Sequence, residues 1–188
     1  MPTTFPTRTT PGSDSNNGSG REMRCGSSEL RAVRAADGKA VTLTGYASRY
    51  DTKSEPIYGM FYEIVRRGAF KAALDGKDDV RALLNHDTSK VLGRTSSKTL
   101  RLSEDDKGLK FELDLPDTSV ARDVATLVER RDISEMSFGF RKIKDQWSEE
   151  KTPEGLLIDV RELIEVELFD ISPVAFPAYP DTDVAVRS

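Results

Sequence analysis

Residues 133–143 read ISEMSFGFRKI, and their alternation is the strongest indication of fold in the chain. Large apolar side chains alternate there with small or polar ones, which is the pattern of a strand with one buried face. The apolar face carries Met136, Phe138 and Phe140. The other face carries Ser137, Gly139 and Arg141. We therefore predict a strand whose Ser137 hydroxyl points away from the core.

Segments on both sides of this strand are also extended. Strands are expected at residues 41–47, 61–65, 80–85, 99–102, 109–115 and 156–176. A brief helix is expected at 68–74, and a longer one begins after Thr118 and ends near Arg131, with an apolar stripe along one side. Strands of uneven spacing with only these helices predict an α+β chain that is mainly β. The expected architecture is a closed or nearly closed β-barrel flanked by helices.

The N-terminal region has a different composition. Of residues 1–20, 16 are Pro, Thr, Gly, Ser or Asn. Such a segment has too few apolar side chains to offset the conformational entropy that it would lose on folding. We expect a flexible tail over residues 1–25 and one domain over 26–188, which suits a chain of 188 residues. A second weakly structured stretch is expected at 144–155, where Trp147 stands among charged residues.

Composition excludes several classes of protein. The net charge is −4 with interleaved signs, which argues against a nucleic-acid-binding surface. No apolar run is long enough to span a membrane, and the N-terminus lacks a secretory signal, so cytoplasmic synthesis is expected. One cysteine and one histidine allow neither an internal disulfide nor a zinc site of the usual kind. We expect no metal and no cofactor, and interpret Cys25 as incidental.

Serine-dependent hydrolysis needs a hydroxyl and a base, and the base is usually histidine. A hydrolase of this kind would have to use His86, the single histidine, which stands at the end of a predicted strand. Ser137 is a candidate nucleophile, and Gly139 on the same face leaves room for a substrate backbone. Taken alone, an ordinary surface or structural histidine and an ordinary outward-facing strand serine are the favoured interpretations of the two residues. No G-x-S-x-G elbow surrounds Ser137, which disfavours an α/β-hydrolase.

Ordered motifs surround both candidates. They read RGAF at 67–70, LNHD at 84–87, LGR at 92–94, DKGL at 106–109, LPDT at 115–118, MSFGF at 136–140 and ELFDISPVAFPAY at 167–179. In order and spacing, over about residues 40–182, the set resembles the HK97-type phage prohead protease family. That family is similar in fold to the herpesvirus assemblins, a β-barrel ringed by helices.

The resemblance implies a function. Ser137 would be the nucleophile and His86 the general base of a serine endopeptidase. Its substrate would be the scaffolding segment of the major capsid protein, or a separate scaffold, cut inside the procapsid in the cytoplasm of an infected bacterium. Self-cleavage and a homodimer are further expectations, whereas nucleic acid and membrane are not expected as partners. The alternatives are a catalytically silent barrel that binds capsid or scaffold proteins, and an esterase of small molecules.

The third member of the site is open between two residues. Assemblins use a second histidine, which this chain lacks, so a carboxylate is expected: Glu167 or, alternatively, Asp170. Apolar residues at even positions, such as Val166 and Leu168, predict that Glu167 faces outward with Ser137 and that Asp170 faces inward. We therefore favour Glu167, although a β-bulge would reverse this parity. By analogy, backbone N–H groups of residues 172–175 are candidate oxyanion donors.

Overall fold

The computed structural model describes residues 20–26, 29–36, 40–76, 78–152 and 155–176. Its strands are β1 (Glu22–Gly26), β2 (Arg31–Arg34), β3 (Val41–Arg49), β4 (Phe61–Val65), β5 (Arg81–Leu84), β6 (Asp87–Arg94), β7 (Leu100–Glu104), β8 (Gly108–Asp114), β9 (Glu135–Lys151) and β10 (Leu157–Val174). Its helices are α1 (Lys71–Asp75) and α2 (Ser119–Arg130). We predicted a flexible tail over residues 1–25. Residues 1–19 lie outside the described part of the chain, whereas residues 22–25 belong to β1 and are therefore not part of a tail.

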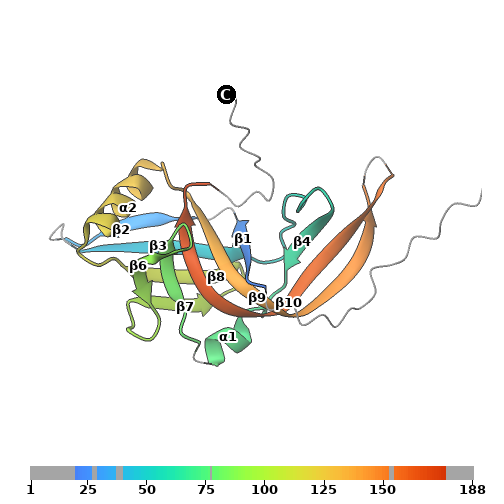
Figure 1. Ribbon diagram of the computed structural model, residues 1–188, viewed down its shortest axis with the longest axis horizontal. Helices are drawn as coiled ribbons and strands as arrows, with labels where there is room; N and C mark the ends of the chain where they lie inside the picture. Colours follow the sequence, from blue (N-terminus) through green and yellow to red (C-terminus); the bar gives the residue numbers. More distant parts are fainter. Residues whose placement is uncertain (1–19, 27–28, 37–39, 77, 153–154, 177–188) are drawn as a thin grey trace, which may run out of the picture.

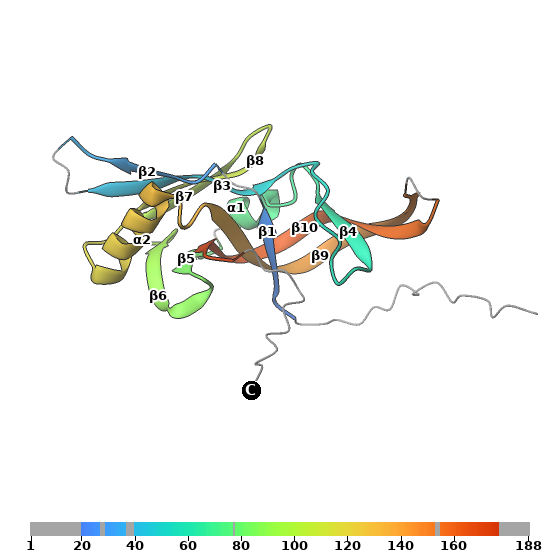
Figure 2. The same ribbon diagram turned by 90° about the horizontal axis from the view of Figure 1, so that it is seen from above.

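The strands form two sheets. One has six strands in the order β1-β9-β10-β5-β6, with β4 also paired to β10, and the other has four in the order β2-β3-β8-β7. In Figure 1, β9 and β10 are long curved ribbons that pass the second sheet and continue to β4. Figure 2 shows β2, β3 and β8 in one layer and β5, β9 and β10 in another. The prediction of a mainly β chain is confirmed. We expected a closed or nearly closed barrel, and in the part of the chain described here the strands form two sheets that do not close into a barrel.

The hydrophobic core lies between the two sheets. The apolar face of β9 supplies Met136, Phe138 and Phe140, all buried as the alternation predicts. They meet Leu109, Phe111 and Leu113 from β8, and the ring of Phe70, next to α1, packs edge-on against Phe138. Since Phe138 is buried by its neighbours, Ser137 must project from the opposite face of the same strand.

Helix α2 follows the predicted pattern closely. The Thr118 side chain accepts a hydrogen bond from the Ala121 N–H, a cap that stabilises a helix by about 1 kcal/mol. Val124 and Val128 are buried, and the helix ends at Arg131 in a left-handed conformation. The helix packs beside β2 at one end of the molecule, as both views show (Figures 1 and 2).

The prediction for residues 144–155 is wrong over most of its length. Strand β9 continues to Lys151 and pairs with β10, so Trp147 lies opposite Arg161. The Trp147 ring packs edge-on against Phe61 at the start of β4. Within the described residues, no helix is both long and apolar enough to cross a membrane.

Candidate active site

Ser137 lies on β9, which is flanked by β1 and β10 in the six-stranded sheet. In the antiparallel pairing of β9 with β10, its Cα partner is Ser172. On the other side of β9, its partner is Cys25 of β1. Ser137 has no exposed surface. Its backbone is therefore fixed by strands on both sides.

His86 lies at the tip of the tight hairpin between β5 and β6. Asn85 and His86 both have positive φ, 52° and 57°, and Leu84 pairs with Asp87 across the turn. A two-residue hairpin turn with both central residues in this region is the type I′ turn, in which Asn is favoured. The hairpin is fastened to β10, because Asn85 N–H donates to the Pro173 carbonyl and His86 N–H donates to the Ser172 hydroxyl. The turn thus fixes the direction of the imidazole.

Asp170 reaches the same face of the sheet through a β-bulge. Leu168 pairs with Phe140 and Asp170 pairs with Gly139, so Phe169 is an extra residue on β10. A bulge of this kind moves every later residue to the opposite face. The parity argument that placed Asp170 inward is therefore wrong, since Asp170 lies on the side of Ser137.

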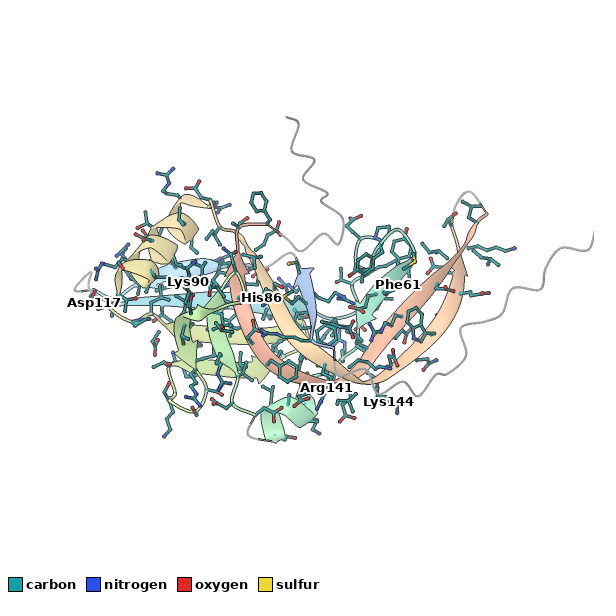
Figure 3. The ribbon with its side chains drawn as sticks, in the orientation of Figure 1. Phe61, His86, Lys90, Asp117, Arg141 and Lys144 are labelled. Carbon is teal, nitrogen blue, oxygen red and sulfur yellow. The ribbon has the colours of Figure 1, made fainter. Side chains whose placement is uncertain are left out.

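The three side chains form a continuous chain of contacts. The Nε2 atom of His86 lies 2.7 Å from the Ser137 Oγ, and its Nδ1 atom lies 2.6 Å from the Asp170 Oδ1. The Ser172 hydroxyl also donates to Asp170 Oδ1, at 3.1 Å. Figure 3 labels His86 where the β5–β6 hairpin meets β9 and β10. Both imidazole nitrogens are thus in contact, one with a hydroxyl and the other with a carboxylate.

Glu167, the favoured third residue, lies elsewhere. Its carboxylate forms an ion pair with Arg141, its partner across β9 and β10. Arg141 is four residues beyond Ser137, a distance of about 13 Å along a strand. Figure 3 shows Arg141 farther along β9, away from His86. The structure therefore brings Asp170, the alternative, into contact with His86, and it does not bring Glu167 there.

The carboxylate of Asp170 is buried, with only 1% of the residue exposed. Burial raises the pKa of Asp170, but the hydrogen bond from His86 and the charge of Arg21 outweigh it and hold the pKa below its ordinary value. The Arg21 guanidinium binds Oδ2, the oxygen that His86 does not use. Asp170 is therefore charged at neutral pH, with a cation beside it.

A pocket opens beside these residues. Its volume is about 460 Å³, and it is lined by Arg21, Met23, Cys25, Asn85, His86, Ser137, Val174 and Phe176. Of the positions suggested for oxyanion donors, Pro173 has no N–H and Ala175 donates its own to the Asn85 Oδ1. The Asn85 side chain carries an NH₂ group with two further donors. The pocket places a hydroxyl, an imidazole and amide donors around one space, which suits acyl transfer.

The sequence did not predict the roles of the Arg21, Asn85 and Ser172 side chains, and position 172 was considered only for its backbone N–H. Asn85 stands in the LNHD motif and Ser172 in the last motif, so their places beside His86 and Asp170 could have marked them. Nothing in the sequence singles out Arg21, at the edge of a predicted tail. In the described residues no group of three or more His, Cys, Asp or Glu side chains is arranged to hold a metal ion.

Comparison with known proteins gives one match. The sequence model of the family described as caudovirus prohead serine protease matches residues 27–188. A search of curated proteins gave no match. A search of solved structures gave none either. The matched range holds Ser137, His86 and Asp170 but not β1.

Proposed function

Because the chain belongs to the caudovirus prohead serine protease family, we propose that it is a serine endopeptidase with Ser137 as nucleophile, His86 as general base and Asp170 as the group that orients His86. The observation that carries this assignment is the contact of Nε2 with the Ser137 Oγ and of Nδ1 with the Asp170 carboxylate. Such contacts have no use in a catalytically silent capsid-binding module, whereas a hydrolase depends on them.

In the proposed reaction, His86 takes the Ser137 proton while Oγ forms a bond to the substrate carbonyl carbon. The C–N bond then breaks, and the amine leaves with the proton returned by His86. Water hydrolyses the resulting ester by the same route. Asp170 accepts a hydrogen bond from Nδ1–H throughout, which keeps Nε2 free to act as base and stabilises the imidazolium. The Asn85 NH₂ group is a candidate donor to the oxyanion, because Asn85 lines the pocket beside His86 and Ser137.

The proposed substrate is the scaffolding segment of the major capsid protein, or a separate scaffold protein, cut within the procapsid of an infected bacterium. Family membership supports this substrate class, because prohead proteases act in capsid maturation. We further propose that the enzyme cleaves its own chain. The substrate would bind in the 460 Å³ pocket that Ser137 and His86 line.

Co-expression with the capsid protein tests the proposal. Wild type, Ser137→Ala and Ser148→Ala should be compared by intact mass of both proteins. Ser148 is an exposed serine on the distal part of β9 and provides the matched control. We expect Ser137→Ala to abolish cleavage, with a rate loss of at least roughly 10³-fold, and Ser148→Ala to cleave like wild type. Capsid cleavage that persists in a folded Ser137→Ala variant would rule out the assignment.

A further inference from the structure

Strand β1 lies outside the range that the family match covers, yet it forms one side of the candidate site. It pairs with β9 so that Cys25 lies opposite Ser137 and Met23 opposite Gly139. Side chains at odd positions of β1 therefore share the face of Ser137. Met23 and Cys25 of β1 line the pocket, together with Arg21, which directly precedes the strand.

Arg21 directly precedes β1, and its side chain reaches across β9 to β10. Its guanidinium passes over Gly139 and binds the Asp170 Oδ2. A Cβ atom at Gly139 would lie 2.2 Å from Oδ2, 2.9 Å from Arg21 Nε and 3.0 Å from Arg21 Nη2. Only glycine leaves room for this contact, so the middle strand is shaped to let Arg21 meet Asp170.

We propose that Arg21 is a positioning residue of the active site, which makes β1 a part of the catalytic apparatus. This inference rests on the proposed function. With His86 and Ser172 on Oδ1 and Arg21 on Oδ2, both oxygens of the carboxylate are engaged and its plane is fixed. The carboxylate in turn fixes the imidazole that faces Ser137. Arg21 itself acts on the substrate only through Asp170.

The opposite face of β1 is anchored, which indicates that the strand stays in place. Glu22 and Arg24 enter a cluster of ion pairs with Glu63 and Arg161, whose side chains are 3% and 8% exposed. Removal of β1 would leave Glu63 and Arg161 buried with each other and Asp145 but without two of their partners. Loss of one side of a buried ion pair is strongly destabilising. A strand that only passed through the site as a self-substrate would not need such an anchor.

The test measures how fast a fluorophosphonate, a probe that reacts with activated serines, labels Ser137 in the full chain. Wild type should be compared with Arg21→Gln and Arg21→Lys. Arg34→Gln is the control, because Arg34 is an exposed arginine of β2, in the four-stranded sheet, where it forms an ion pair with Glu129 of α2. Thermal unfolding of each variant reports whether the fold is kept. Added methylguanidine tests for rescue of an Arg21→Ala variant, which a purely structural role of Arg21 would not give.

We expect Arg21→Gln to be labelled at least about tenfold more slowly than wild type, Arg21→Lys to lie between them, and Arg34→Gln to match wild type. Methylguanidine should restore part of the rate in Arg21→Ala. Labelling of Arg21→Gln at the wild-type rate would overturn the role of Arg21. Faster labelling would also overturn it and identify β1 as a cover over Ser137. A wild type that is not labelled would defeat the proposed function and this inference together. If Arg21→Gln does not fold, the comparison of Arg21→Lys with wild type decides the question.

Discussion

Replacing Asp170 by asparagine should inactivate the enzyme through the wrong tautomer of His86. The amide at position 170 would keep one oxygen and put an NH₂ group in place of the other. Arg21 carries only donors and cannot face that NH₂, whereas the Ser172 hydroxyl can rotate and accept. The amide oxygen would therefore face Arg21 and the NH₂ would face His86. The imidazole would then accept at Nδ1 and carry its hydrogen on Nε2, toward Ser137.

A histidine in this state cannot take the Ser137 proton, so the loss should be of the order of 10⁴-fold in kcat. That corresponds to about 5 kcal/mol of transition-state stabilisation. Glu167→Gln is the matched control, because Glu167 is a carboxylate of the same strand that pairs with Arg141 away from His86. It should keep activity within about twofold of wild type.

The assay is steady-state cleavage of a peptide that spans a site identified by intact mass, with thermal unfolding to confirm folding. Combining Arg21→Ala with Asp170→Asn gives a second check, since the amide could then turn its oxygen toward His86. We expect the double variant to be more active than Asp170→Asn alone. If folded Asp170→Asn keeps more than about a tenth of wild-type activity, or if Glu167→Gln loses as much, the tautomer argument is refuted.

Two further predictions use the same contacts. Gly139→Ala should displace Asp170 and lower the cleavage rate sharply, because the added Cβ would lie 2.2 Å from Oδ2. Thermal unfolding should show a destabilisation of about 1–3 kcal/mol. Gly20→Ala is the control and should change neither the cleavage rate nor the stability, because its Cβ would meet nothing within 4 Å. If the chain trims its own N-terminus, N-terminal sequencing of active enzyme should find Arg21–Gly26 retained, and active enzyme that begins after Gly26 would contradict the role of β1.

Much of the fold follows from local patterns that buried faces impose. Alternation along β9 predicts which side chains enter the core, and the Thr118 cap marks the start of α2. The same reasoning fails where a strand carries charges on both faces. The distal half of β9, residues 144–151, reads KDQWSEEK. It lies beyond the core, and most of its side chains are exposed. A pattern of apolar alternation cannot reveal a strand that buries neither face.

The candidate site was predictable only in part. The motifs around His86 and Ser137 drew attention to both, and the structure places them in contact. The choice between Glu167 and Asp170 depended on one residue, Phe169, whose bulge leaves no trace in the sequence since Leu168 and Phe169 are both apolar. Alternation in the sequence predicts the face of a side chain only where each residue pairs with one residue of the next strand. A bulge adds one unpaired residue, so the alternation assigns the wrong face to the residues that follow it.

The role of Arg21 could not be predicted from the sequence for a different reason. A carboxylate as buried as Asp170 needs hydrogen bonds in place of those it loses to water, and the imidazole can donate to only one of its two oxygens. The second partner could have come from any segment that reaches the same face, and it is Arg21, which lies directly before β1 and ahead of the family's matched range. Family motifs describe what the members share, so a residue supplied from outside them is invisible to motif comparison. If Arg21 has the proposed positioning role, the catalytic unit of this chain extends at least to Arg21, whereas the family match begins after β1, at residue 27.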